Sequence, residues 1–371
     1  MPILLQYLYA IGTFQGLLLS GLLLFTPNVS YASRILACWC VFLAAGLFSM
    51  LVTQSGEIAP YNLWIVWTGF LPASYGALLY LYCRHSVLDD GFHAKDLLHL
   101  LPIASCYLLN FDLIFSPGLL EQAYLQGIDP ESVRFTLGEI ILYAQAFVYM
   151  GYTAHFIYRY QQLAQNNFAN FNPDIFDWLW IVQGFNFVIW STKAVATVVT
   201  DNFVLMVVGD FLIVVLIYTI GMAQWRNPKL FKIAAPVKED SPEPGSDSDL
   251  KGAGALDEDT RSSLLETVVQ YMKSQQAFLQ SELSLQRLSE AVGISTHHLS
   301  EVLNQEEGRN FYNFVNGFRI DYVCDRLKVD DDIKLLDLGL EAGFSSKSTF
   351  NSVFKKHTGM TPSQFRDRDM H

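Results

Sequence analysis

The sequence predicts an all-α protein in which a seven-span transmembrane helix bundle precedes a small domain with two helix-turn-helix units. Three observations predict this architecture. The chain has 371 residues, of which 51% are hydrophobic and 16% charged, and a mean hydropathy of +0.24, more apolar than a soluble globular chain. Long apolar stretches recur through residues 1–225. Near the end, two helix-sized segments about fifty residues apart repeat one pattern of caps and apolar positions.

The first apolar stretch, residues 3–25, contains no charged residue. At about 1.5 Å per residue, a helix of this length crosses roughly 30 Å of hydrocarbon. A signal peptide is the alternative, but the segment lacks a basic beginning and further spans follow. Those spans are predicted at residues 35–54, 62–83, 97–115, 137–159, 178–200 and 203–224.

Charge between the spans predicts the topology, because short cytoplasmic loops are enriched in Lys and Arg. With the N-terminus outside, the outer connections hold only Arg134. The inner connections hold seven cations, namely Arg34, Arg84, Lys95, Arg159, Arg226, Lys229 and Lys232. We therefore expect a multi-pass protein of the bacterial inner (cytoplasmic) membrane with its C-terminal domain in the cytoplasm.

Four ionisable residues fall in the outer halves of predicted spans: Asp112, Glu139, Lys193 and Asp210. Charge inside a membrane is costly, so such residues are usually paired or functional. Lys193 and Asp210 lie at matching depths across a short hairpin, which predicts an ion pair. The pair either braces the hairpin or, with Glu139, forms a signal-sensing site that the 117–135 loop would cover.

Small residues form a stripe on the first span at Gly12, Gly16 and Ser20. Such a stripe lets two helices approach closely. Packing within the chain and dimerisation explain it equally well.

The segment after the last span changes character twice. Residues 226–232 (RNPKLFK) form a basic collar, which we expect to lie on the anionic head groups of membrane lipids. Residues 233–259 hold eight acidic and two basic residues without an aromatic, which predicts a disordered linker with a reach of roughly 30 Å. Such a soft tether transmits no rigid twist, so we expect signalling by dimerisation, by release of a docked domain or by cleavage. This argument fails if the C-terminal domain docks against inner loops.

The repeated segments are residues 288–304 and 343–365. Ser295 and Ser346 are predicted N-caps, and Gly343 supplies a tight turn. Apolar residues at helical spacing predict the buried faces, at Leu299, Val302 and Leu303 and at Phe350, Val353 and Phe354. The opposite faces carry Thr296, His297, Ser300, Glu301 and Asn304, and Lys347, Ser348, Asn351, Ser352 and Lys355. Polar faces with cations suit the major groove of double-stranded DNA. One such helix alone is more often an ordinary amphipathic helix, but the repeat favours DNA binding.

Residues 260–371, about 30% of the chain, resemble the DNA-binding domain of the AraC/XylS family of bacterial transcription regulators. The resemblance rests on LSLQRLSEAVGISTHHLSEVLN, then FVNGFRIDYVCDRL, then LLDLGLEAGFSSKSTFNSVFKKHTGMTPSQFR, with the middle segment inside one long connecting helix at 310–327. It implies two recognition helices in adjacent major-groove segments, a homodimer on DNA, and contact with RNA polymerase. Gly339 departs from the family, which usually has Ala there; glycine costs about 1 kcal/mol of helix propensity.

Charge is a second departure from that resemblance. The region has 13 Lys and Arg against 15 Asp and Glu, a net charge of −2. A domain without net positive charge should make few phosphate contacts and bind non-specific DNA weakly.

No residues form a convincing catalytic or metal site. The five cysteines, Cys38, Cys40, Cys83, Cys106 and Cys324, provide no disulfide framework, and no cofactor is predicted. The sequence therefore predicts a non-enzymatic, membrane-bound one-component regulator, with a sensor at 1–225, a collar and linker at 226–259 and a DNA-binding domain at 260–371. Its signal would be an unknown small molecule or periplasmic stimulus. The alternatives are a transporter or channel with a cytoplasmic regulatory or tethering domain, disfavoured by the absence of an inverted repeat, and a membrane enzyme acting on lipid.

Overall fold

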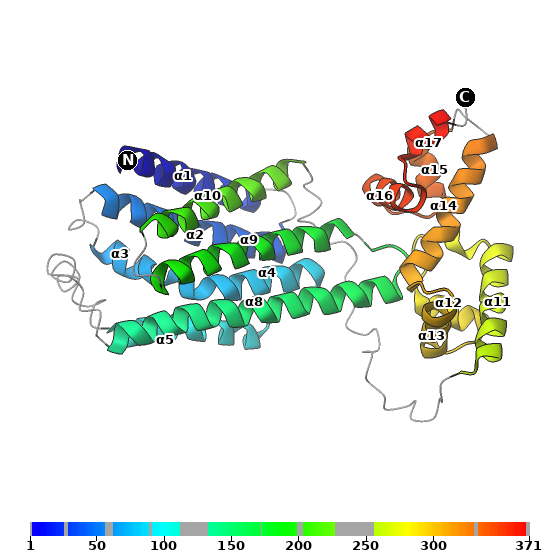
Figure 1. Cartoon of the computed structure of the whole chain (residues 1–371), viewed down its shortest axis with the longest axis horizontal. Coiled ribbons are helices and arrows are strands. Elements are labelled where there is room, and N and C mark those ends of the chain that lie inside the picture. The colour runs from blue at the N-terminus through cyan, green and yellow to red at the C-terminus, as the bar shows by residue number, and fades with distance from the viewer. Residues whose placement is uncertain are drawn as a thin grey trace. The chain divides into compact units, whose positions relative to one another are not determined.

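The computed structural model describes residues 2–25, 29–55, 62–88, 91–111, 133–171, 173–198, 203–226, 256–329 and 333–368. Within these ranges the protein is helical and contains no strand; the only β pairing is an isolated bridge between Phe168 and Ser284. The chain forms two compact units (Figure 1). The N-terminal unit comprises Met1–Tyr158 and Asp177–Pro236, and the C-terminal unit comprises Arg159–Phe176 and Val237–His371.

The N-terminal unit is built on long helices that pack side by side. Its helices include α1 (Pro2–Leu24), α2 (Tyr31–Ser55), most of α8 (Val133–Asn167), most of α9 (Pro173–Val198) and α10 (Phe203–Arg226). Helix α1 lies against α2 and α10. A Cβ atom on Gly16 would lie 3.0 Å from the Cβ of Ala44, and one on Gly12 would lie 2.7 Å from Val214. The small-residue stripe therefore serves close packing within the chain.

Two of the predicted spans are not continuous helices. The predicted 62–83 helix is divided into α3 (Asn62–Gly69), η2 (Leu71–Ser74) and α4 (Tyr75–Val87). Pro72 causes the division, because it lacks the N–H of a helix interior and favours the first turn of a new helix. The predicted 97–115 helix is instead η3 (Ala94–Leu100) followed by α5 (Leu101–Leu109), with Pro102 in the first turn of α5.

Four of the described helices are long and apolar enough to cross a membrane, fewer than the seven predicted. They are Ile3–Leu24, Tyr31–Ser55, Thr136–Asn167 and Phe203–Arg226. Helix α9 has sufficient length at 26 residues, but it is not among the four, because polar residues such as Gln183, Asn186 and Lys193 lower its hydropathy.

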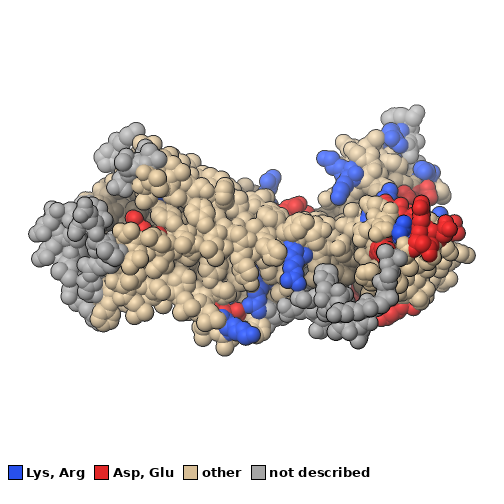
Figure 2. Space-filling model, turned by 60° about the horizontal axis from the view of Figure 1, so that its bottom comes forward, with Lys and Arg blue, Asp and Glu red and all other residues tan. Residues whose placement is uncertain are grey.

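The outward face of the N-terminal unit is apolar. On α1, the side chains of Leu4, Phe14 and Leu22 are 74%, 67% and 55% exposed. Comparable apolar residues are exposed on α8, α9 and α10, among them Val148, Phe187 and Phe211. The face of this unit that Figure 2 shows carries few charged residues. An apolar outer surface of this kind is typical of a helix bundle that contacts lipid.

The C-terminal unit consists of short helices joined by tight turns, drawn yellow to red in Figure 1. In order they are α11 (Glu258–Ser274), η5 (Ala277–Leu279), α12 (Leu285–Val292), α13 (Thr296–Glu306), α14 (Phe311–Val329), α15 (Leu335–Glu341), α16 (Lys347–Thr358) and α17 (Pro362–Arg368). Helices α12 and α13 form the first helix-turn-helix unit, and α15 and α16 form the second. Helix α14 confirms the predicted connecting helix. The predicted caps are also confirmed: the Oγ of Ser295 accepts from the N–H of His298 at 3.1 Å, and that of Ser346 from Thr349 at 3.2 Å.

Each helix-turn-helix unit has its own apolar core. Leu299 and Leu303 of the first unit join a cluster with Phe311, Phe314 and Val315 of α14. In the second unit, the predicted Phe350, Val353 and Phe354 are buried together with Phe344 and Phe365. These cores fix which faces of α13 and α16 remain outside.

Gly339 is explained by the second core. A Cβ atom at this position would lie 2.8 Å from two ring atoms of Phe350, closer than real Cβ contacts. A large aromatic ring thus occupies the space that an alanine side chain at this position would need.

Candidate nucleic-acid interface and candidate ligand pocket

Helix α16 presents its predicted polar face to solvent. Lys347, Ser348, Ser352 and Lys355 are exposed, and Asn351 is half-buried. The buried Phe350, Val353 and Phe354 anchor the opposite side of the helix and leave this face free of the core. The face therefore combines hydrogen-bonding side chains with two cations, the groups that are typical of a surface that binds base edges and phosphates.

Helix α13 presents only part of its predicted face. His297 and Asn304 are exposed, and Thr296 and Ser300 are half-buried, with the Nδ2 of Asn304 donating to the Oγ of Ser300 at 3.3 Å. Glu301 behaves differently, because its Oε1 accepts from the backbone N–H of Leu256 at 3.2 Å, just before α11. Glu301 is thus engaged within the domain, whereas the other four residues remain accessible.

The two candidate recognition helices differ in charge. Helix α16 contains Lys347, Lys355 and Lys356 and no acidic residue, and its last turn is basic. Helix α13 contains Glu301 and Glu306 and no Lys or Arg. The Oε1 of Glu306 forms an ion pair with the Nε of Arg261 at 2.7 Å, which ties the end of α13 to α11. Of the two helices, only α16 therefore carries lysine side chains.

Arg319 on α14 connects the parts of the domain. Its side chain is fully buried, and it donates from Nε to the carbonyl of Phe278 at 2.7 Å and from Nη2 to that of Gln280 at 2.8 Å. Burial lowers the pKa of Arg319 to about 10, so the guanidinium remains protonated near neutral pH. A buried charge of this kind is tolerated because carbonyl oxygens surround it. Sequence analysis gave Arg319 no role, because it lies in the middle of a helix read only for its apolar positions.

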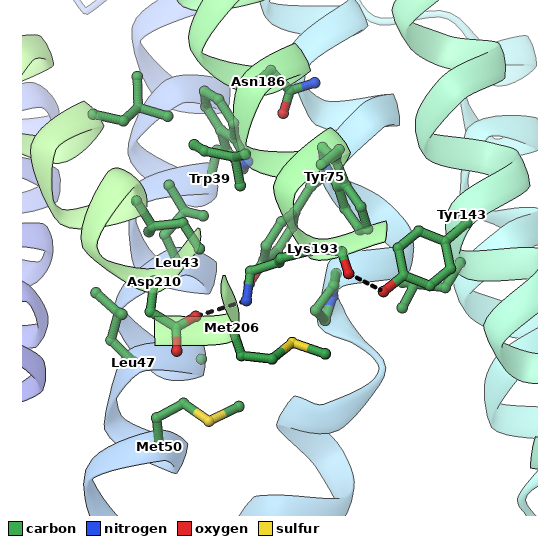
Figure 3. Close-up of a pocket in the computed structure, with 17 residues that line it drawn as sticks. Trp39, Leu43, Leu47, Met50, Tyr75, Tyr143, Asn186, Lys193, Met206 and Asp210 are labelled. Atoms are coloured by element: carbon green, nitrogen blue, oxygen red, sulfur yellow. Dashed lines mark hydrogen bonds and ion pairs between the residues drawn. The ribbon is translucent and has the colours of Figure 1, made fainter. Parts of the chain in front are cut away.

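A cavity of about 200 Å³ lies inside the N-terminal unit, between α2, α4, α8, α9 and α10 (Figure 3). Its walls are mainly apolar and aromatic, with Trp39, Tyr75, Tyr143 and Trp190 among the lining residues. Lys193 and Asp210 line the same cavity, and the predicted ion pair is present, with Nζ and Oδ1 2.7 Å apart. A mainly apolar cavity with a few polar groups is the usual form of a small-molecule site.

Further polar contacts hold the pair in place. The hydroxyl of Tyr9 donates to Oδ2 of Asp210 at 3.0 Å, and Gly209 lets the Lys193 side chain pass close to α10, since a Cβ there would lie 2.9 Å from its Cγ. The side-chain amide of Asn186 also lines the cavity and is 3% exposed, yet its Nδ2 has no hydrogen-bond partner among the described residues. An unsatisfied buried donor is unfavourable unless something else accepts from it.

The remaining predicted sensing residues are placed differently. Glu139 is exposed and is not among the residues that line the cavity. Asp112 and most of the 117–135 loop lie outside the described residues. Sequence analysis missed Asn186, although a polar side chain in the middle of a predicted span carried the same signal as the charged residues. In the described parts of the chain, no three His, Cys, Asp or Glu side chains are grouped so as to hold a metal ion.

Comparison with known proteins places the C-terminal region in a recognisable class. Residues 288–368 match the family described as "Helix-turn-helix domain". An uncharacterized HTH-type transcriptional regulator of Staphylococcus aureus (strain COL) is 40% identical over 85 residues, which are 23% of this chain and 11% of that protein. The uncharacterized transcriptional regulatory protein YesN of Bacillus subtilis (strain 168) is 34% identical over 70 residues, 19% of each chain. The chain thus spans about a tenth of the length of the S. aureus relative.

Two solved structures are similar to part of this chain. The C-terminal domain of AraT, a response regulator from Geobacillus stearothermophilus, is 26% identical, with a TM-score of 0.26, over 28% of this chain and 84% of that chain. A protein of unknown function from Listeria innocua is 27% identical, with a TM-score of 0.26, over 28% of this chain and 95% of that chain. The family match and the related regulators show that the C-terminal region is an AraC-type helix-turn-helix domain of the kind found in DNA-binding transcription regulators.

Proposed function

We propose that this protein is a membrane-bound one-component transcription regulator that binds specific double-stranded DNA through α13 and α16. The observation that carries the proposal is that both helices have accessible polar faces. Their opposite, apolar faces are buried in the cores of the two helix-turn-helix units, which one connecting helix, α14, joins. On DNA the protein acts as a homodimer and contacts RNA polymerase. Dimerisation is supported by the net charge of −2 for residues 260–371, which limits the affinity of a single domain.

Genome occupancy of the full-length protein tests this proposal. Cross-linked chromatin from cells that carry the wild-type chain should be enriched in a small set of DNA sites. The control is the double variant Asn351→Ala, Lys355→Ala, which removes one predicted base contact, from the half-buried Asn351, and one predicted phosphate contact, from the exposed Lys355. Equal occupancy by the wild type and this control, at every site, would exclude DNA reading by α16.

The N-terminal unit is proposed to span the bacterial inner membrane seven times, with the N-terminus outside and the C-terminal unit in the cytoplasm. Four long apolar helices, with exposed apolar side chains, support part of this count. The divided segments at 62–87 and 94–111 and the polar helix α9 would complete it. Polar side chains of α9 such as Asn186 and Lys193 line the internal cavity, where polar groups are tolerated. Reporter fusions after Trp225 should be cytoplasmic, and fusions in the 117–135 loop should be exterior. A periplasmic reporter after Trp225 would contradict the topology.

The cavity around Lys193 and Asp210 is proposed to receive the signal. Its apolar walls and the Nδ2 of Asn186, which has no hydrogen-bond partner among the described residues, suit a small, largely apolar molecule with a hydrogen-bond acceptor at one end. Asn186→Leu keeps the side-chain size and removes the donor. The variant should accumulate in membranes at the wild-type level. Its target genes should no longer respond to cell extracts that induce transcription through the wild-type protein. A full response from Asn186→Leu would remove this residue from ligand recognition.

A further inference from the structure

The turn between α8 and α9 packs against the helix-turn-helix domain and belongs to the C-terminal unit, which includes Arg159–Phe176. Ala169 is fully buried in the same apolar cluster as Leu283, Phe311 and Val315. Its N–H donates to the carbonyl of Leu283 at 3.2 Å, beside the isolated bridge between Phe168 and Ser284. The turn is thus an integral part of the core of this unit.

Side chains of α14 bind the same turn. The Nδ2 of Asn316 donates to the carbonyl of Ala169 at 3.2 Å, and the Nη1 of Arg319 donates to the Oδ1 of Asn170 at 2.9 Å. The ring of Phe171 packs edge-on against Tyr312, with centroids 4.6 Å apart. The guanidinium of Arg319 therefore donates hydrogen bonds both to the carbonyls before α12 and to the turn. Charge-assisted hydrogen bonds of this type are stronger than neutral ones.

Asn170 contacts both helix-turn-helix units at once. Its Nδ2 donates to the carbonyl of Ser281, which precedes α12, at 2.6 Å, and to the carbonyl of Gly343, in the turn before α16, at 2.8 Å. Gly343 adopts a φ of +91° and lies so close to residue 279 that a Cβ would be 2.6 Å from the Leu279 carbonyl oxygen. One side chain thus joins the two chain segments whose positions determine where α13 and α16 lie.

We propose that residues 168–171 are an intramolecular docking segment that sets the relative position of the two recognition helices and thereby couples α8 and α9 to DNA affinity. This inference rests on the proposed DNA-binding function. The polar face of α16 stays exposed while the segment is docked. Docking therefore fixes the positions of the two helix-turn-helix units and does not cover their recognition helices. Preorganisation of two binding elements raises affinity by removing part of the ordering cost, so the docked state is the form that binds DNA tightly.

The test uses the full-length protein in lipid nanodiscs and a DNA duplex that the wild type selects from a random-sequence pool. Asn170→Ala removes the donor to Ser281 and Gly343 and the acceptor for Arg319. Phe171→Ala undocks the segment through a different contact. Asn167→Ala is the matched control, because the Nδ2 of Asn167 donates to the carbonyl of Leu163 within α8. Hydrogen exchange of residues 278–284 and 312–319 reports docking, and the Kd for the duplex reports function.

Both Asn170→Ala and Phe171→Ala should raise exchange in these two segments and weaken DNA binding by about tenfold, whereas Asn167→Ala should change neither. Faster exchange with an unchanged or tighter Kd would overturn the coupling and leave a purely structural contact. Unchanged exchange in both variants would overturn the docking role itself. If the wild type selects no duplex at all, the proposed DNA-binding function fails, while the exchange measurement still decides whether the segment docks.

Discussion

Replacing Gly339 with alanine sets two effects of known sign against each other. In the interior of a helix, Gly→Ala usually stabilises by about 1 kcal/mol through helix propensity. In this protein the new Cβ would lie 2.8 Å from the Cγ and Cδ1 atoms of Phe350. Something must then move, and the free energy of unfolding depends on whether the ring can yield.

The surroundings of Phe350 leave it little room. Its side chain is 1% exposed, and its ring lies 5.4 Å from that of Phe344 and 5.8 Å from that of Phe354. Overpacking of a tight core costs about 1–3 kcal/mol. With this cost larger than the gain in propensity, Gly339→Ala should destabilise the second helix-turn-helix unit by about 1 kcal/mol.

Native-state hydrogen exchange of α16 amides in the full-length protein measures this change as a fall in opening free energy. Gly317→Ala in α14 is the matched control, because its Cβ would meet its nearest neighbour at 3.5 Å, an ordinary contact, and it should stabilise the domain. Adding Phe350→Leu to Gly339→Ala should recover part of the loss by making room. Stabilisation by Gly339→Ala as large as that by Gly317→Ala would refute the reasoning.

Four further outcomes follow from the two candidate sites. Asn351→Ala should cost about 1–3 kcal/mol on the selected duplex and relax preference at one base, as a competition assay would show. Lys355→Ala should weaken all sequences alike and reduce the slope of log K against log salt by about one. Glu301→Ala should leave sequence preference unchanged, in contrast to Asn351→Ala, and speed hydrogen exchange at the start of α11, because its carboxylate binds the Leu256 N–H. The double variant Lys193→Asp, Asp210→Lys should insert into the membrane at normal levels but lose the response to the signal. Induction at the wild-type level by this variant would leave the Lys193–Asp210 pair only a role in bracing the hairpin.

Local patterns predicted the C-terminal unit well. The caps at Ser295 and Ser346, the buried stripes of α13 and α16, and the connecting helix α14 all follow from hydrogen bonding and periodicity within single segments. The pairing of Lys193 with Asp210 was likewise predictable, because depth in a span is read directly from residue number.

Contacts between distant segments were not predictable from these patterns. Glu301 appeared free on the helical wheel of α13, but the chain before α11 packs against it. The division at Pro72 was visible in the sequence, yet the unbroken apolar character of residues 62–83 favoured one helix. Residues 168–171 have no helical or strand periodicity, and their partners lie more than a hundred residues away, so nothing in the sequence indicated that they dock.

The docked turn changes the argument about how a signal reaches the DNA-binding domain. Most of the linker predicted at residues 233–259 lies outside the described residues, and a linker of that composition would not by itself orient the domain. Asn170, in contrast, lies between the ends of two helices and binds both helix-turn-helix units at distances of 2.6 and 2.8 Å. Because N–H···O bonds weaken beyond about 3.2 Å, a movement of the α8 and α9 ends by roughly 1 Å would break these contacts. In the proposed mechanism, a movement at the ends of α8 and α9 therefore reaches the two helix-turn-helix units through Asn170.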